Sequence, residues 1–437
     1  MKANIATTRA PMWWVPSLYF AQGLPFAVVM VMAGIMYKRL GIANGDITYW
    51  TSLLGLAWVV KPLWSPLLEL SGNKKTVVVL FQGLGGLALI GAGLTLRLPG
   101  FFVFSVAALA LAAMASSSHD VAADGLYIQS LSPREQAVYA GWLGTFWNGG
   151  KLFVQGALVV LAGQLEASLG VHAAWSLVLA LPGAILCLLA LYHWWAVPGA
   201  APAAGTPLSV ATVARTTAEV LGSFFRKPGI WLSIVFIVLF RAGEGQVQSI
   251  GRLFLIEARG NGGLGMSTAD MGLAYGTFAS VAFVAGSILG GYFGAWRGLR
   301  KSMFLMILAM NAPNLTFCYL SVYLPSGMLE ISAILCVEMF GFGFGSTGLV
   351  LYMMQVVAPG KYPTAHYALG TGIMQLGLVL STMVSGKIQL WLGYQHFFIW
   401  GVLAAVPVLL LSLFVALPGK EAAARDEAPA AGRAVSA

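Results

Sequence analysis

The chain has 437 residues, of which 59% are hydrophobic and 9% are charged, and its mean hydropathy is +0.82. Soluble domains carry about 25% charged residues, so this composition excludes an ordinary soluble protein and indicates one that crosses a lipid bilayer many times. The net charge is +9, but the basic residues stand singly or in pairs, so we expect no nucleic-acid partner.

Continuous apolar runs of about 20 residues recur along nearly the whole chain. Continuous runs favour helices over a β-barrel, so the predicted class is an all-α membrane protein. The first run is too long for a signal peptide and lacks a small-residue cleavage site, so we expect it to remain as a span. The runs predict twelve transmembrane helices near residues 13–36, 46–67, 76–96, 101–129, 137–163, 173–195, 230–251, 268–294, 302–322, 327–356, 364–390 and 393–417.

Composition divides the chain into an N-terminal six-helix half (1–195), a cytoplasmic linker (196–229), a C-terminal six-helix half (230–418) and a disordered cytoplasmic tail (419–437). With both termini in the cytoplasm, fifteen of the 24 Lys and Arg residues fall in inner loops and tails and five in outer loops. This bias is what the positive-inside rule expects, so we predict a multi-pass inner-membrane protein with both termini cytoplasmic.

An internal repeat supports the division into two halves. Leu126–Gln129 recurs as Leu351–Gln355, and Tyr139–Gly141 recurs as Tyr367–Gly370, at a shift of about 225 positions. Two parallel six-helix repeats with a substrate site between them are typical of some transporter folds. By this organisation the chain resembles the major facilitator superfamily, so the predicted architecture is the major facilitator fold.

Two carboxylates, Asp120 and Asp124, stand at the end of a long apolar run. On a helix, Ser117, Asp120, Asp124 and Tyr127 share one polar face. Carboxylates inside a membrane are costly and usually mark an ion or substrate path. Counting about 20 residues from Phe101 places them near the far edge of the bilayer, so the alternative is a solvated membrane edge.

Other ionisable residues also lie within predicted spans. Arg241 and Glu244 are three apart and close enough to pair, either as a switch opened by substrate or as a fixed ion pair. Lys151 either neutralises Asp120 from the neighbouring helix or reaches a membrane surface. Glu338 suits proton exchange or a hydrogen-bonded packing role, so we expect proton coupling to involve the carboxylates Asp120, Asp124 and Glu338.

Amide and aromatic side chains complete the predicted substrate cavity. Gln22 and Asn311 lie where Gly or Pro interrupts a span, which indicates either a cavity lining or a plain kink. Trp147 is placed to stack on a sugar. The three cysteines lack metal-type spacing, and we expect no metal and no cofactor. The predicted cavity residues are Gln22, Trp147, Asn148, Lys151, Arg241, Glu244, Asn311 and Gln375.

Four further motifs lie in the first half of the chain, namely Tyr19–Pro25, Lys61–Leu67, Ser118–Gly125 and Leu131–Glu135. At these residues the chain resembles the AmpG-type muropeptide permeases, within the group that contains the acetyl-coenzyme A transporters. The resemblance implies proton-driven import across the cytoplasmic membrane of cell-wall fragments built on N-acetylglucosaminyl-anhydro-N-acetylmuramic acid. Asp120 and Asp124 match the acidic positions of that family.

We therefore expect a monomeric secondary transporter, not an enzyme, that carries a small molecule together with protons. The leading interpretation is a symporter for muropeptide-like or amino-sugar saccharides. A second interpretation keeps the fold but changes the cargo to a siderophore or another bulky polar solute. A third is a polytopic membrane enzyme that uses His119 and Asp120, although no nucleophile or metal set accompanies them in the sequence.

Overall fold

The protein is described by a computed structural model, and its secondary structure is helical, with no strand in the part of the chain that the model describes. The predicted all-α class is confirmed. The predicted tail (419–437) and residues 200–209 of the predicted linker lie outside that part. The described residues are 10–61, 64, 68, 73–131, 133–199, 210–415 and 417.

Ten helical stretches in these ranges are long and apolar enough to cross a membrane. One of them, Ala365–Leu411, has 47 residues and contains Gly393, whose φ of 72° breaks the helix, so it holds the last two predicted spans. The predicted span 46–67 begins with α3 (Asn44–Leu54) and α4 (Leu56–Val60) and then runs into residues outside the described part. The structure is therefore consistent with twelve spans.

By contacts the chain forms two compact units. The first comprises Met1–Arg215, Arg252–Ala258 and Gly265–Thr277, and the second comprises Thr216–Gly251, Arg259–Leu264 and Phe278–Ala437. The division by chain order into halves at 1–195 and 230–418 stays a prediction.

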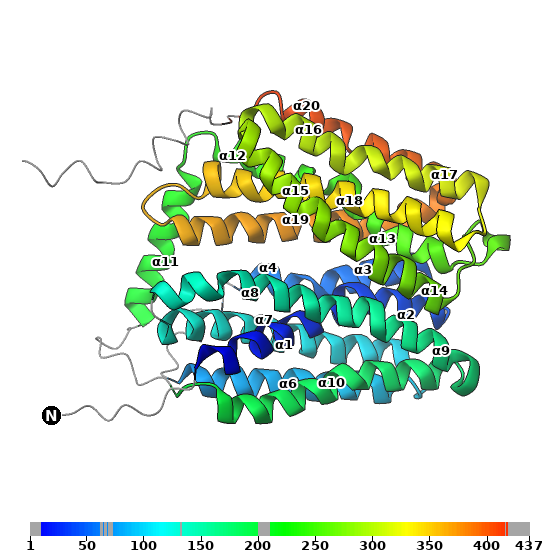
Figure 1. The fold of residues 1–437 in the computed structure, drawn as a ribbon, viewed down its shortest axis with the longest axis horizontal. Helices are drawn as coiled ribbons and strands as arrows, with labels where there is room; N and C mark the ends of the chain where they lie inside the picture. The colour runs from blue at the N-terminus through cyan, green and yellow to red at the C-terminus, as the bar shows by residue number, and fades with distance from the viewer. Residues whose placement is uncertain are drawn as a thin grey trace, which may run out of the picture. The chain divides into compact units, whose positions relative to one another are not determined.

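The first unit is built around α7, which packs against α6, while α6 also packs against α10 (Figure 1). Its apolar core joins Val15 and Leu18 of α1 to Ala123 and Leu126 of α7. Burying these side chains removes apolar surface from solvent and fixes α1 beside the polar stretch of α7. The helices are α1 (Val15–Ala27), α2 (Ala33–Arg39), α3, α4, α6 (Lys74–Thr95), α7 (Phe101–Ser130), α8 (Pro133–Leu152), α9 (Val159–Leu169), α10 (Val171–Ala196) and α14 (Thr268–Met271).

The second unit is organised around α18, which packs against α15 and α16. In its core the ring of Phe236 packs 4.9 Å from that of Tyr352, whose hydroxyl donates to Ser233 Oγ at 2.7 Å. Its helices are α11 (Val210–Phe225, which starts in the first unit), α12 (Ile230–Phe240), α13 (Ala242–Ile256, which ends in the first unit), α15 (Ser280–Arg297), α16 (Leu299–Asn311), α17 (Leu315–Tyr323), α18 (Met328–Tyr352), α19 (Pro363–Leu403) and α20 (Val406–Leu411).

Several helices continue into π-helical segments, in which the backbone hydrogen bonds are displaced by one residue. Such segments occur mostly as local irregularities and are frequent at functional sites. They follow α1, α8, α14 and α18, as η2 (Val28–Met32), η4 (Phe153–Leu158), η6 (Gly272–Ala279) and η8 (Met353–Val357).

Candidate functional site

The two carboxylates of α7 are each held by a group from another helix. Tyr19 of α1 donates its hydroxyl to Asp124 Oδ1 at 2.9 Å. Lys61, which directly follows α4, forms an ion pair with Asp120. The Asp120 side chain is 15% exposed and that of Lys61 is 32% exposed, whereas Asp124 is exposed. The two carboxylates therefore connect α7 to α1 and to the end of α4.

In the structure Asp120 pairs with Lys61. The sequence had suggested Lys151 as its partner, as one of two alternatives. In the structure the Lys151 amine stands 4.6 Å from the centre of the Trp147 ring and 6.0 Å from that of Phe26. A cation over an aromatic face is stabilised by the charge distribution of the ring. Lys151 and Trp147 thus form one cationic and aromatic surface on α8.

A close helix crossing brings α1 and α8 together. A Cβ at Gly23 would overlap the Trp147 carbonyl oxygen, and a Cβ at Gly150 would lie 2.5 Å from the Phe20 carbonyl oxygen. Only glycine permits such an approach, because it has no side chain. The crossing also brings Phe26 to within 5.4 Å of Trp147, measured between ring centres.

The two amides predicted for this part of the cavity differ in their bonding. Gln22 is 5% exposed, and its Oε1 has no hydrogen-bond partner among the described residues. It lies one turn beyond Tyr19 on α1. Asn148 is half-buried and donates to the Gly144 carbonyl of its own helix at 2.9 Å. Gln22 is therefore the amide with unused bonding capacity in a buried position.

In the second unit, Arg241 and Glu244 form the predicted ion pair, with Arg241 Nε 3.1 Å from Glu244 Oε2. The Glu244 side chain is fully buried, and Arg241 also stacks on Phe342 at 5.1 Å. Glu338 on α18 is buried as well. The Arg241–Glu244 pair and Glu338 therefore lie in the apolar interior of this unit.

Asn311 and Gln375 are further predicted cavity residues of the second unit. Asn311 ends α16 and donates to the Ile307 carbonyl at 2.9 Å, while its Oδ1 has no partner in the described part of the chain. Gln375, on α19, is half-buried, and its Nε2 likewise has no partner there. Each therefore has a buried polar atom without a hydrogen-bond partner in the described part of the chain.

Two contact residues of the carboxylate site, Tyr19 and Lys61, were not among the predicted site residues. For Tyr19 the sequence did contain a signal, because Tyr19 precedes Gln22 by three positions and so shares its helix face. Trp64 also belongs to the site's surroundings, since its indole N–H donates to Ser118 Oγ at 3.1 Å. Its motif was noted in the sequence, but only the fold shows the partner.

A second polar cluster in the first unit is centred on Glu166 of α9. Its carboxylate accepts from Arg39 Nη2 at 2.8 Å, from Trp175 Nε1 at 2.8 Å and from Thr268 Oγ1 at 3.0 Å. The donors come from α2, α10 and α14. The cluster therefore ties α14 to helices that are distant from it in the sequence.

Comparisons with known proteins agree with this arrangement. A family model of the Major Facilitator Superfamily matches residues 17–365. The anhydromuropeptide permease of Escherichia coli strain K12 is 25% identical over 410 residues, which cover 91% of this chain and 78% of the permease. A transporter of Rickettsia conorii named AmpG 4 is 22% identical over 412 residues, covering 91% and 94% of the two chains.

Solved structures show the same fold. The nucleoside transporter NupG aligns with a TM-score of 0.66 at 16% identity, covering 92% of this chain and 98% of its own. The xylose transporter XylE of E. coli, in an inward open conformation, aligns with a TM-score of 0.68 at 12% identity, covering 94% and 97%. The relatives and the fold are those of transporters and not of enzymes.

Proposed function

Because the chain belongs to the Major Facilitator Superfamily and is related to an anhydromuropeptide permease, we propose that it imports muropeptide-like or amino-sugar saccharides together with protons across the cytoplasmic membrane. The observation that carries this proposal is the pair of carboxylates on α7, held by Tyr19 and Lys61. We place both termini in the cytoplasm and treat the monomer as the working unit.

The chemistry of the α7 site suits proton exchange. Asp124 accepts a hydrogen bond from Tyr19, which keeps its carboxylate oriented. A proton on Asp120 would remove the charge that holds Lys61. Protonation therefore changes contacts between α7 and its neighbours, which is how a bound proton can shift the balance between two conformations.

The surface of α8 suits a saccharide that carries a carboxylate. The Trp147 ring offers a flat face for a pyranose ring, and Lys151 beside it offers a cation for a lactyl or peptide carboxylate. In the second unit, the residues that we propose for substrate or proton binding are Arg241, Glu244, Glu338, Asn311 and Gln375. Alternating access would then move substrate and proton together through the protein.

The test is uptake of radiolabelled N-acetylglucosaminyl-anhydro-N-acetylmuramic acid into proteoliposomes with an imposed inward proton gradient. Asp124→Asn keeps the size and the acceptor oxygen of the side chain but cannot exchange a proton. We expect it to lose gradient-driven accumulation, about 100-fold in initial rate, and to retain exchange of external label for internal unlabelled substrate. Normal gradient-driven accumulation by Asp124→Asn would contradict the coupling role.

The substrate class is tested separately, by competition. Unlabelled muropeptides, chito-oligosaccharides and siderophores are each added to the wild-type uptake assay. The proposal expects the anhydro-disaccharide to compete best, with chito-oligosaccharides weaker and siderophores without effect. Competition by siderophores alone would replace the cargo while leaving the fold assignment in place.

A further inference from the structure

A row of hydrogen-bonded polar side chains runs through the interior of the first unit, away from the Asp120 ion pair. Ser17 Oγ on α1 lies 2.9 Å from His193 Nε2 on α10, and His193 Nδ1 lies 2.8 Å from Gln82 Oε1 on α6. Gln82 Nε2 donates to the Leu186 carbonyl at 3.4 Å. His193 and Gln82 are 0% and 3% exposed.

The contact with Leu186 fixes the proton on His193. A carbonyl only accepts, so the Gln82 atom beside it must be the amide nitrogen, and the amide oxygen must face His193. The His193 Nδ1 atom therefore carries a proton and donates to Gln82. In a neutral ring Nε2 is then an acceptor for the Ser17 hydroxyl at 2.9 Å, and this hydroxyl also lies 3.2 Å from the Trp14 carbonyl of its own helix. Hydrogen-bond donation along the row therefore runs in one direction, from Ser17 to His193 and from His193 to Gln82.

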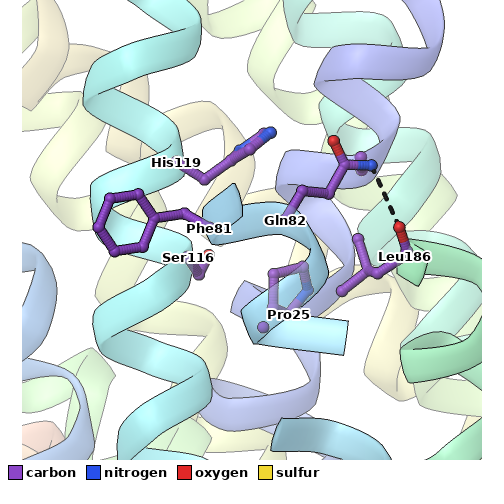
Figure 2. A pocket seen from close by; sticks show the side chains of 8 residues that line it. Pro25, Phe81, Gln82, Ser116, His119 and Leu186 are labelled. Carbon is purple, nitrogen blue, oxygen red and sulfur yellow. Dashed lines mark hydrogen bonds between the residues drawn. The ribbon is translucent and has the colours of Figure 1, made fainter. Parts of the chain in front are cut away.

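The row ends at a small cavity. Gln82 lines this cavity together with Ser116 and His119 of α7, and the remaining walls include Ala21, Phe81 and Leu186. Figure 2 shows the His119 ring extending from α7 on the side of Gln82. His119 is 3% exposed, and its Nε2 has no hydrogen-bond partner among the described residues.

The size and lining of the cavity select its occupant. Its volume is about 10 Å³, which is the room that a single water molecule needs. A buried water is stable where two to four polar groups converge. Most of the lining is apolar, and the polar side chains on it are those of His119, Ser116 and Gln82. A sugar, a metal with its ligands or a lipid chain is far too large for this space.

We propose that the cavity binds one structural water molecule that joins Gln82 to His119, and that this water makes His119 a positioning residue for Asp120. The completed row would connect α1, α6, α7 and α10. Because His119 and Asp120 are consecutive on α7, holding the His119 ring fixes the rotation of the helix about its axis. That rotation decides whether Asp120 faces Lys61.

The first test looks for the water directly. The full-length protein in lipid nanodiscs is imaged by cryo-electron microscopy at a resolution that shows ordered water. The proposal expects one density peak within hydrogen-bond distance of both His119 and Gln82. An empty cavity, or a His119 ring bonded to a protein group instead, would overturn it.

The second test reads the tautomers by ¹⁵N magnetic resonance, because the chain has only five histidines. We expect His193 to be protonated at Nδ1. Gln82→Leu should change the resonances of both His193 and His119, whereas Ser17→Ala should change that of His193 alone. An unchanged His119 signal in folded Gln82→Leu protein would contradict a water bridge between the two residues.

The third test separates positioning from a purely structural role. The proposal expects His119→Leu to raise the KM for uptake at least fivefold, and His119→Gln, whose amide can still bond the water, to restore it to within twofold of wild type. The matched control is His396→Gln, an exposed histidine of the second unit. Equal KM values in the Leu and Gln variants would overturn the role assigned to His119. This outcome is distinct from failure of the proposed function, in which the wild-type protein itself would not transport.

Discussion

The ion pairs and hydrogen bonds of the predicted site residues differ between the two units. In the first unit, Asp124 and Asp120 of α7 are bound by Tyr19 and Lys61, which lie on other segments, and both carboxylates are at least partly exposed. In the second unit, Arg241 and Glu244 lie one turn apart in sequence and form a largely buried pair. A pair between segments is broken by their relative movement, whereas a pair within one turn is not. We therefore propose that the contacts of Asp120 and Asp124, rather than the Arg241–Glu244 pair, change when a proton binds.

The largest effect is expected on removing the buried half of the local pair. Glu244→Leu leaves the Arg241 guanidinium in the apolar interior without its counter-ion, which should reduce the free energy of unfolding by about 3–5 kcal/mol. Thermal unfolding of the detergent-solubilised protein measures this. The control is Glu330→Gln, whose carboxylate bonds Tyr319 at the exposed end of α18 and should change little.

Exchanging the charges of Arg241 and Glu244 also tests how much their pair contributes to stability. The double variant Arg241→Glu with Glu244→Arg should recover more than half of the stability lost in either single neutralisation, because an ion pair within one turn works in both orders. A double variant no more stable than the singles would show that the environment is specific to one order. The Arg241–Glu244 pair would then resemble the α7 site instead of contrasting with it.

A smaller loss of stability is expected at the pair between segments. Lys61→Met should reduce the free energy of unfolding by about 1–2 kcal/mol, because Asp120 loses its counter-ion but retains some access to water. Uptake driven by a proton gradient should fall at least tenfold, since the contact that protonation breaks is already absent. Lys301→Met, at an exposed position of α16, is the control. Unchanged gradient-driven uptake in Lys61→Met would place coupling elsewhere.

A single hydrogen bond is removed by Tyr19→Phe, so its effect is smaller again. Asp124 loses one donor but is exposed, so water can replace it, and the expected cost is about 1 kcal/mol. The KM for substrate should change by less than the maximal rate of uptake, because Tyr19 touches the proposed proton site. Tyr292→Phe, at an exposed position of α15, serves as the control. A change in KM alone would assign Tyr19 to substrate binding instead.

Much of the fold can be predicted from the sequence because a membrane span is recognised by the length of its own apolar run. The all-α class and the superfamily follow from that pattern and from the repeat. The partners of the site residues do not, because a partner depends on how helices that are distant in sequence pack. The sequence shows that Asp120 and Asp124 share a face, but only the packing of α1 and α4 on α7 shows Tyr19 and Lys61 against them.

The adjacent residues Trp147 and Asn148 show the same limit of prediction from sequence. Asn148 gives the smallest predicted effect. Adjacent in sequence, both were assigned to the cavity, yet the Asn148 amide is bonded to the Gly144 carbonyl of its own helix. Asn148→Ala should therefore alter the KM by less than twofold and stability by less than about 0.5 kcal/mol. Trp147→Ala, which removes the ring beneath Lys151, should raise the KM about tenfold. Measuring both in the same uptake assay decides which side chain meets the substrate, and a larger effect at Asn148 would reverse the assignment.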